Sequence, residues 1–250
     1  MRDVGPIAIA QTVAVKGDIA ANLARHGALA QIAAGEGARL VLFPELALTG
    51  YEPGLAAGLA LEAGDARLAP LREAAVGNGI VIVTGAPLKT AGLPLIAALS
   101  FLPDGATQVY TKQCLHAGEE SAFAPGDGGV ALSLDDVHIA LAVCADTTRR
   151  EHVAAAARGG AGLYAASMLI SENGYAQDAA MLAGYARELR MPVAMANHGG
   201  PTGGWASAGR SALWDEDGNV VIAAEGAGEC LLLAWRDRHG WRARTIGEHS

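Results

Sequence analysis

The stretch IALAVCADTTRR, Ile139 to Arg150, places a cysteine where an apolar run turns polar. Five apolar residues precede Cys144, which is typical of a buried strand that ends at the thiol. A helix is expected to begin at about Arg149, because Thr148 and Glu151 fit the T-x-x-E capping box. In open α/β sheets, ligands and reactive groups lie outside the carboxyl ends of strands, so Cys144 is a candidate functional residue.

The chemistry expected at Cys144 depends on this placement. A helix N-terminus next to the thiol would favour the thiolate, which is the reactive form of a cysteine. The alternative is a structural cysteine buried in the core, since unpaired cysteines are among the most buried residues. The stretch alone is compatible with both interpretations.

Outward from this stretch, short apolar runs alternate with longer alanine-rich amphipathic segments. This alternation predicts an α/β fold, and hairpins that turn at Pro103-Asp104-Gly105 and at Asp217-Gly218 indicate mixed sheets. Strands are predicted at 7–15, 39–44, 79–88, 130–134, 137–143, 162–167, 193–197 and 230–235 and in hairpins at 95–110 and 211–224; helices are predicted at 19–37, 65–76, 149–158 and 175–190. Since no linker or low-complexity stretch divides the chain, one domain over residues 1–250 is expected.

Composition excludes several classes of protein. With 250 residues, 51% of them hydrophobic, the chain can build a large core, and its net charge of −8 with no basic cluster argues against a nucleic-acid partner. No apolar run reaches the ~18 residues of a membrane span, and the N-terminal segment lacks the pattern of a secretory signal. The three cysteines form no CxxC pair and the histidines no HExxH, so we expect reduced thiols, a cytoplasmic location and no metal site.

A second candidate group is Glu45, which directly follows the apolar run RLVLFP. Pro44 is expected to end that strand. A carboxylate at the strand end loses part of its contact with water, which raises its pKa toward the range of a general base. The alternative is an ordinary solvated loop glutamate.

A third candidate is Lys112, which closes the predicted strand at 108–111. Glu119 and Glu120 follow seven and eight residues later. A lysine at a strand end is usually a solvated charge at the edge of a sheet. The thiol, the carboxylate and this ammonium nevertheless all follow predicted strands, so one sheet rim is expected to gather them.

Taken together, these stretches resemble the nitrilase superfamily of carbon–nitrogen hydrolases over nearly the whole chain. FPELALTGY is similar to the family's glutamate motif, YTKQCLHAGEESAFAPGD to its lysine motif and VCAD to its cysteine motif. The reactive residues are 67 and 32 positions apart (112 − 45 and 144 − 112). The resemblance implies Glu45 as general base, Lys112 as oxyanion stabiliser and Cys144 as nucleophile.

The resemblance also implies two accessory groups. One is a second glutamate in the lysine motif; counting six back from Pro125 favours Glu119 over Glu120. The other is the backbone N–H of Ala145, as a further oxyanion donor. The sequence departs from the family pattern at three places, and all three bear on the choice of substrate. Ala145 replaces an aromatic residue, Cys114 replaces a histidine, and Arg149-Arg150-Glu151 replaces Phe-Pro-Glu after the cysteine motif.

The family fold is a four-layer α-β-β-α sandwich with two mixed β-sheets, and its members usually form a homodimer or a higher homo-oligomer. The expected activity is that of a thiol amidohydrolase, which cleaves a non-peptide C–N bond of a small amide or N-carbamoyl compound without metal or cofactor. The alternatives are a true nitrilase, whose small-molecule partner is a nitrile, and a non-catalytic or redox-sensing relative.

Two features outside the motifs have two interpretations each. Arg149 and Arg150 would either pair with a substrate carboxylate or form a charged helical turn on the surface, and the surface is favoured. The loop at 197–209 is either a rim or lid of the pocket or a plain surface loop. Its Trp205 would accordingly pack on substrate, in the core or at an interface.

Overall fold

The computed structural model describes residues 4–247, in which thirteen strands form two sheets. The seven-stranded sheet has the order β13-β12-β1-β2-β3-β4-β5, and the six-stranded sheet has the order β11-β10-β9-β8-β7-β6. The strands are β1 (Val4–Gln11), β2 (Leu40–Leu42), β3 (Val81–Leu88), β4 (Leu95–Phe101), β5 (Thr107–Thr111), β6 (Leu132–Leu134), β7 (Val137–Val143), β8 (Leu163–Ser167), β9 (Val193–Ala196), β10 (Ala212–Trp214), β11 (Val220–Ala223), β12 (Cys230–Asp237) and β13 (Gly240–Ile246). The α-helices are α1 (Ile19–Gly35), α2 (Ala56–Leu59), α3 (Ala69–Asn78), α4 (Arg150–Arg158) and α5 (Tyr175–Leu189).

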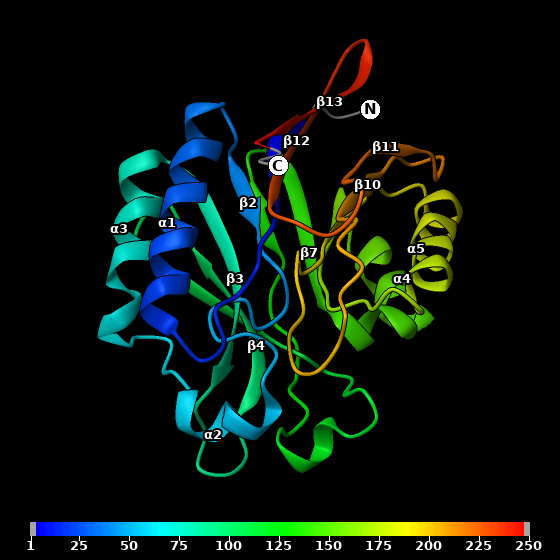
Figure 1. The fold of residues 1–250 in the computed structure, drawn as a ribbon. Coiled ribbons are helices and arrows are strands. Elements are labelled where there is room, and N and C mark those ends of the chain that lie inside the picture. The colour runs from blue at the N-terminus through cyan, green and yellow to red at the C-terminus, as the bar shows by residue number, and fades with distance from the viewer. Residues whose placement is uncertain (1–3, 248–250) are drawn as a thin grey trace.

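The two sheets pack face to face between two pairs of helices (Figure 1). Helices α1 and α3 cover the outer face of the seven-stranded sheet, while α4 and α5 cover the six-stranded sheet. Both sheets are mixed: β1, β2 and β3 are parallel, whereas β4 runs antiparallel to β3 and β5. The predicted four-layer α-β-β-α sandwich is therefore confirmed.

Side chains that alternate along each strand supply the layers of the core. In β1, Ile7 and Ile9 face the other sheet, while Ala8 and Ala10 pack toward the helices. Strand β7 alternates in the same way between the core that separates the sheets and the core under α4 and α5. Because both faces of each sheet are covered, the central strands are apolar throughout, which explains their near-continuous hydrophobic runs. Among residues 4–247, no helix is long and apolar enough to cross a membrane.

Helix α4 begins within one residue of the predicted start, but its cap differs from the prediction. A 3₁₀ helix, Cys144–Thr148, begins at the cysteine itself, and α4 follows it without a side-chain cap. The Thr148 hydroxyl donates to the carbonyl of Ala145 at 2.8 Å, so it does not accept from the helix as a capping box requires. The predicted capping box is wrong because the chain has already turned into a helix one turn earlier.

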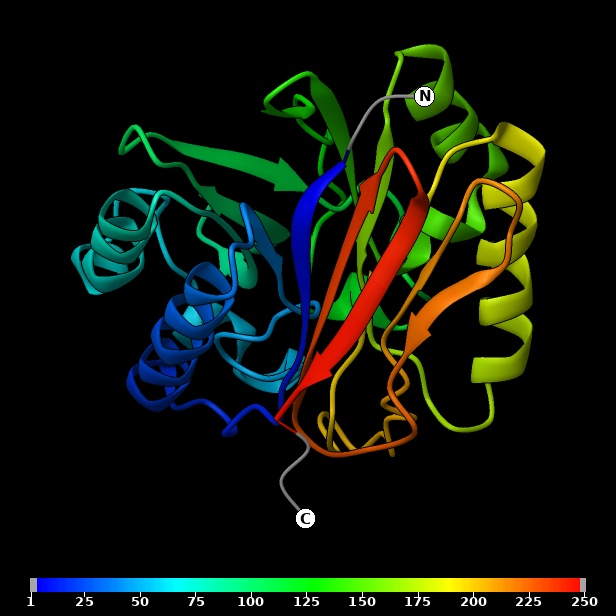
Figure 2. The ribbon, with the colours of Figure 1, turned by 90° about the horizontal axis from the view of Figure 1, so that it is seen from above.

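The segment after β12 forms a strand, β13, that the sequence pattern did not predict. Its residues GWRARTI mix charged and apolar side chains, as befits an edge strand with one solvated face. Strand β13 pairs with β12, and β12 pairs antiparallel with β1. Figure 2 shows the consequence: the strands from the end of the chain complete the sheet beside its first strand.

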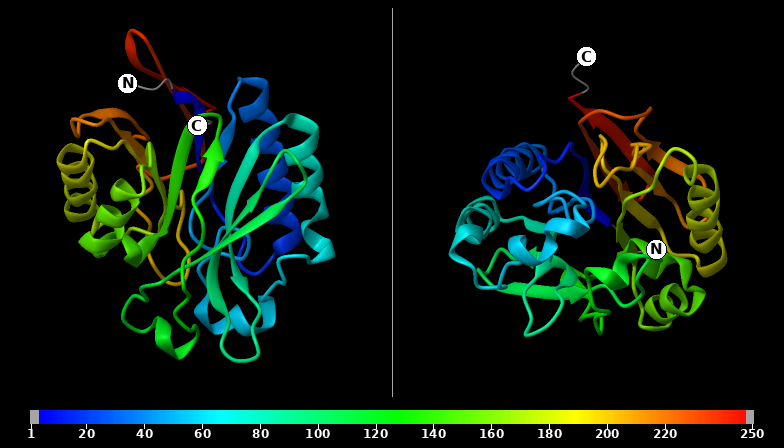
Figure 3. Two further views of the ribbon diagram at one scale, coloured as in Figure 1. Left: turned by 180° about the vertical axis from the view of Figure 1, so that it is seen from behind. Right: turned by 60° about the horizontal axis from the view of Figure 1, so that its bottom comes forward.

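The strand ends that precede the three candidate residues belong to two different sheets. Strands β2 and β5 run in the same direction in the seven-stranded sheet, so they end at the same edge, whereas β7 belongs to the six-stranded sheet. The prediction that one sheet rim gathers all three groups is therefore wrong. The two sheets lie against each other (Figure 3), and the Ser167 hydroxyl in β8 donates to the carbonyl of Phe43, after β2, at 2.7 Å.

Candidate active site

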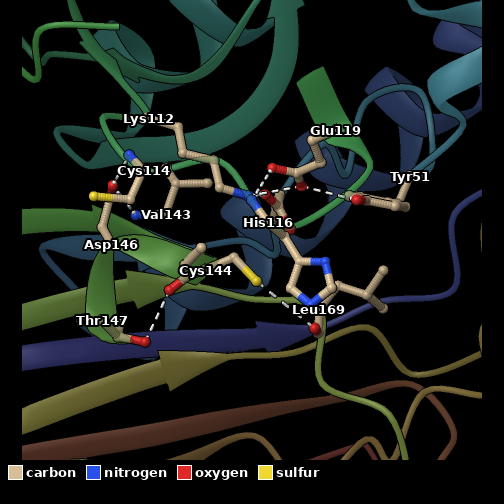
Figure 4. A network of polar contacts seen from close by, with 12 residues as sticks. Tyr51, Lys112, Cys114, His116, Glu119, Val143, Cys144, Asp146, Thr147 and Leu169 are labelled. Carbon is tan, nitrogen blue, oxygen red and sulfur yellow. Dashed lines mark hydrogen bonds and ion pairs between the residues drawn. The ribbon is translucent and has the colours of Figure 1, made fainter. Parts of the chain in front are cut away.

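Lys112 lies at the centre of a buried ionic cluster. It follows β5 directly, and its side chain is 0% exposed, so it is not the solvated edge charge that a strand-end lysine usually is. The ammonium Nζ lies 2.7 Å from Oε1 of Glu45. It also lies 2.8 Å from Oε1 of Glu119 (Figure 4). A buried cation is costly unless it is paired, and here two carboxylates compensate it.

The structure also distinguishes the two neighbouring glutamates of the lysine motif. Glu119 is buried; it accepts the Tyr51 hydroxyl on Oε1 at 2.8 Å and the backbone N–H of His116 on Oε2 at 2.8 Å. Glu120 is exposed and accepts a backbone N–H of its own turn. The side chain that meets Lys112 is therefore that of Glu119, the residue favoured by counting back along the motif.

Glu45 is held in a tight turn after β2. The next residue, Leu46, has a positive φ of 50°, which is uncommon for a residue other than glycine. Gly85 in β3 allows the turn to approach, because a Cβ there would lie 2.1 Å from the backbone nitrogen of Leu46. The Leu48 N–H also donates to the Gly85 carbonyl at 3.0 Å. These contacts fix the backbone from which the Glu45 side chain projects.

A buried histidine secures the same turn from the other side. Nε2 of His198 lies 2.6 Å from the backbone carbonyl of Glu45, and since a carbonyl only accepts, Nε2 carries the proton. Burial lowers the pKa of His198 to about 4, so its imidazole is neutral at physiological pH. Its role in the fold is to hold the Glu45 backbone in place.

Cys144 sits in a strained backbone conformation. Its φ is 44°, and it opens the 3₁₀ helix directly after β7. Sγ lies 3.8 Å from the carbonyl of Leu169, and the Thr147 hydroxyl donates to the Cys144 carbonyl at 2.8 Å (Figure 4). Strained strand-to-helix turns are a recurrent way to present a nucleophile, because the turn pushes the side chain out of the sheet.

Asp146 connects the turn of the cysteine to the loop of the lysine. One carboxylate oxygen accepts the backbone N–H groups of Gln113 and Cys114 at 2.9 and 2.8 Å. The other accepts the N–H of Val143 at 3.0 Å and the hydroxyl of Tyr110 at 2.8 Å. Asp146 is fully buried and lies outside the pocket wall, so it positions both segments without reaching the pocket.

The environment shifts the three reactive groups away from their ordinary titration. Burial raises the pKa of Glu45 to about 7, although Lys112 opposes the shift. Burial lowers the pKa of Lys112, but the negative groups around it outweigh that effect, so its net pKa lies above the ordinary value. Burial and Glu45 raise the pKa of the Cys144 thiol, so the free protein holds a neutral thiol. Burial thus opposes the thiolate that a helix N-terminus is expected to favour.

One oxygen of this cluster has no hydrogen-bond partner. Among residues 4–247, Oε2 of Glu45 is buried and receives no hydrogen bond, while the Cys144 thiol is close enough to influence the pKa of Glu45. A carboxylate oxygen in this setting is suited to accept a proton. The described part of the chain contains no group of three or more His, Cys, Asp or Glu side chains arranged to hold a metal ion.

A cavity of about 230 Å³ opens onto these groups. Ala145 lies in the wall of this cavity. Trp205 also lines it, so the loop at 197–209 forms part of the pocket rim, as in the first of its two interpretations. Arg149 lines a separate cavity and Arg150 pairs with Glu188 on the surface, so neither arginine reaches this pocket. The lining residues are Glu45, Tyr51, His116, Glu119, Cys144, Ala145, Thr147, Thr148, Met168, Leu169, Ile170, Ser171, Gly174, Asp178 and Trp205.

Two residues of the site were not singled out from the sequence. Tyr51 is the last residue of the glutamate motif FPELALTGY, and a tyrosine at a fixed offset from the general-base candidate was the available signal. His198 follows shortly after the end of β9, just as Glu45, Lys112 and Cys144 follow the ends of other strands. Strand-end placement alone would have indicated His198.

Comparison with known proteins agrees with this geometry. The family model described as carbon-nitrogen hydrolase matches residues 6–244. Glutamine-dependent NAD(+) synthetases from two strains of Xylella fastidiosa are 33% identical over 245 residues, which is 93% of this chain and 43% of theirs. The chain thus spans less than half the length of these curated relatives.

Solved structures of the amidase from Nesterenkonia sp. AN1, of the nitrilase superfamily, share the fold. A cysteine-to-alanine mutant in complex with butyramide is 30% identical, with a TM-score of 0.85 over 92% of this chain and 90% of that one. A glutamate-to-glutamine mutant, with acrylamide added at the active site cysteine, is 30% identical, with a TM-score of 0.84 over 91% of each chain. The chain belongs to the carbon-nitrogen hydrolase family and is an enzyme of the nitrilase superfamily.

Proposed function

We propose that this enzyme is a thiol amidohydrolase that cleaves a non-peptide C–N bond of a small amide or N-carbamoyl compound through a cysteine thioester. The observation that carries the proposal is the buried Lys112 ammonium, 2.7 Å from Glu45 and 2.8 Å from Glu119, beside the pocket whose wall contains Cys144. This arrangement supplies a base, a fixed positive charge and a nucleophile to one small cavity.

The first half of the reaction is the attack of Cys144 on the substrate carbonyl carbon. Since the thiol is neutral, its proton must leave as the sulfur attacks, and the unpartnered Oε2 of Glu45 is available to accept it. A base with a pKa near 7 is suited to this step, because it is largely ionised at neutral pH yet still able to return the proton.

Negative charge then develops on the former carbonyl oxygen. The Lys112 ammonium and the backbone N–H of Ala145 stabilise this oxyanion. Ala145 lies in the pocket wall and is the second residue of a 3₁₀ helix, where backbone N–H groups have no acceptor within the helix. Glu119 keeps Lys112 charged and oriented, and Tyr51 in turn fixes Glu119.

The second half of the reaction releases the products. Glu45 returns its proton to the leaving nitrogen, which departs as ammonia or an amine while the thioester remains on Cys144. Water then attacks the thioester carbon while Glu45 accepts its proton. The C–S bond breaks, the carboxylic acid leaves, and Glu45 returns that proton to the Cys144 sulfur, which restores the neutral thiol. Apart from the substrate and water, every group in this cycle belongs to the chain.

Amides are preferred over nitriles as substrates because a small amide, butyramide, is bound in the structure of a similar amidase. A cavity of about 230 Å³ suits a molecule of this size. The similarity to glutamine-dependent NAD(+) synthetases supports a second candidate, the release of ammonia from glutamine for a partner enzyme. The pocket lining contains no arginine or lysine, and the Lys112 ammonium beside it is already paired with Glu45 and Glu119, so the glutamine carboxylate would lack a free cationic partner.

The experiment is ammonia release from a panel of butyramide, glutamine, an N-carbamoyl amine and butyronitrile, with the wild-type protein and a Cys144→Ala variant. Ammonia plus acid from the amide, lost in the variant, supports the proposal. Turnover of the nitrile alone would identify a true nitrilase. Turnover of no compound, together with reversible peroxide modification of Cys144, would favour the redox-sensing alternative.

The homodimer or higher homo-oligomer that the family resemblance implies is part of the same proposal. Helices α4 and α5 cover one outer face of the sandwich and carry small residues that allow close packing. Light scattering coupled to size-exclusion chromatography would measure the mass directly; a monomer at micromolar concentration would contradict this part.

A further inference from the structure

Asp178 is a carboxylate in the pocket wall that the proposed mechanism does not use. It lies in the first turn of α5 and is half-buried, and its side chain has no hydrogen bond or ion pair to residues 4–247. Its Oδ2 lies over Gly174, because a Cβ on that glycine would be 3.7 Å from it and 3.6 Å from the Ser171 hydroxyl. Burial raises the pKa of Asp178, and the nearby His116 opposes the shift.

The pocket wall contains more acidic than basic side chains. The wall contains the carboxylates of Glu45, Glu119 and Asp178. Among the described residues that line it, His116 is the one with a basic side chain. The two glutamates share the Lys112 ammonium, whereas Asp178 has no such partner. A concave site lined by charges of one sign attracts ligands of the opposite sign.

The pocket that contains this carboxylate also has an aromatic side chain in its wall. Trp205 lines the same pocket, is 47% exposed and contacts the His116 ring edge-on, with ring centroids 6.3 Å apart. Figure 4 shows the His116 ring on the side of the Cys144 thiol, so the wall runs from the nucleophile through His116 to the rim. Tryptophan is the aromatic side chain that attracts cations best.

We infer that the preferred substrate is a short linear amide whose far end carries a protonated amino group, and that Asp178 binds that ammonium in the pocket that Trp205 also lines. This inference rests on the proposed amidohydrolase function. The amide end lies at Cys144, where Lys112 and Ala145 hold its oxygen, and the ammonium end supplies the cation that Asp178 lacks. A substrate with a carboxylate at that end meets like charge and is disfavoured.

Asp178 also has a purely structural interpretation, since an acidic residue in the first turn of a helix stabilises the helix dipole. That role is independent of the substrate, so it would affect amides of every charge equally. A difference between a cationic and a neutral amide of the same length therefore separates the two roles.

The experiment compares kcat/KM for 4-aminobutanamide, its neutral analogue pentanamide and the anionic succinamic acid. The wild-type enzyme is expected to prefer 4-aminobutanamide over pentanamide by about tenfold, mainly through KM, and to use succinamic acid least. In Asp178→Asn the preference should fall to about one. The matched control is Glu172→Gln, which removes a nearby exposed carboxylate outside the pocket and should keep the preference.

A wild-type preference for pentanamide, a preference that survives in Asp178→Asn, or an equal loss in Glu172→Gln would overturn the inference. The same three compounds are titrated calorimetrically into Cys144→Ala protein, which binds without turnover. If the wild-type enzyme hydrolyses no amide, the proposed function fails, and the order of binding to Cys144→Ala alone decides the inference. The wild-type comparison also holds if Asp178→Asn does not fold.

Discussion

The carboxylate of Asp146 accepts the backbone N–H of Cys114 at 2.8 Å, and this bond ties the cysteine turn to the lysine loop. Three further donors reach the same carboxylate, so its two oxygens are saturated. Neither residue lines the pocket, yet the spacing of Lys112 and Cys144 depends on their contact. Residues outside the pocket thus determine the relative positions of the reactive groups inside it.

Asp146→Asn is expected to lower kcat by at least about tenfold with a smaller change in KM. The amide NH₂ of asparagine would replace one carboxylate oxygen, and as a donor it cannot accept hydrogen bonds from the donors that face it. The free energy of unfolding should fall by about 2–4 kcal/mol. Steady-state kinetics and urea unfolding measure both effects. Asp104→Asn is the control, since Asp104 accepts a single N–H in an exposed turn; equal losses in the two variants would contradict the positioning role.

Activity and stability are expected to respond to pH in opposite directions through Glu45. The base must be ionised, so kcat/KM should rise with a midpoint near the raised pKa of about 7. Because its pKa is raised, Glu45 in the folded protein keeps its proton above the ordinary pKa of about 4.5. The stabilisation of the folded protein by this proton is complete below about pH 4.5 and is lost as pH rises through about 7. Kinetics and urea unfolding between about pH 5 and pH 8 test both slopes.

Glu45→Gln isolates the effect of this one group. It should reduce activity by about 10²–10⁴-fold and remove both the kinetic midpoint and the matching part of the stability slope. An activity profile of the wild-type enzyme that is flat across this range would show that Glu45 does not act as the base.

The two glutamates of the lysine motif form a matched pair. Glu119→Gln removes one of the two counter-charges of Lys112, so activity is expected to fall by about tenfold or more. Glu120→Gln changes an exposed side chain and should stay within about twofold of wild type. Kinetics on the same amide compares them, and the reverse order would assign the accessory role to Glu120.

The three cysteines should respond differently to substitution. Cys144→Ala is expected to abolish turnover while the melting temperature changes by a few degrees, because the pocket wall loses only a sulfur atom. Cys114→Ala should keep activity, since the Cys114 contact with Asp146 uses its backbone and its side chain lies outside this pocket. Cys230→Ala is also expected to keep activity. Residual turnover in Cys144→Ala would reject the thioester route.

A pair of glycines tests the turn that carries Glu45. Gly85→Ala places a methyl group 2.1 Å from the Leu46 nitrogen, so the turn must move; we expect a loss of about 3 kcal/mol or more in unfolding free energy and a fall in kcat. Gly77→Ala in α3 meets no atom within 4 Å and should be neutral or stabilising by up to about 1 kcal/mol. Similar melting temperatures for both variants would argue against the close approach.

Local pattern predicted the groups of the site better than their arrangement. Glu45, Lys112 and Cys144 follow predicted strands, and that placement is visible in the sequence because strand length and strand end are local properties. Which strands share a sheet depends on pairing between distant segments, so the division of the site between two sheets was not predictable from the runs alone. For the same reason, the contact of His198 with the Glu45 carbonyl, across 153 positions, had no local signature.

Two of the errors in the predicted secondary structure have local causes. The capping box at Thr148 fitted the motif, but Cys144 adopts a positive φ, and the chain turns into a helix before the motif applies. Strand β13 was missed because an edge strand with one solvated face lacks the apolar run of a buried strand.

The pairing of β12 with β1 has a consequence for folding during synthesis on the ribosome. Strand β1 leaves the ribosome more than 200 residues before β12, the partner that covers its free edge. At about 5–20 residues per second, β1 waits on the order of 10–40 seconds for that partner. During synthesis the nascent chain therefore exposes an apolar strand edge, and a chaperone that shields such edges would matter more for the yield of this protein than for its stability once folded.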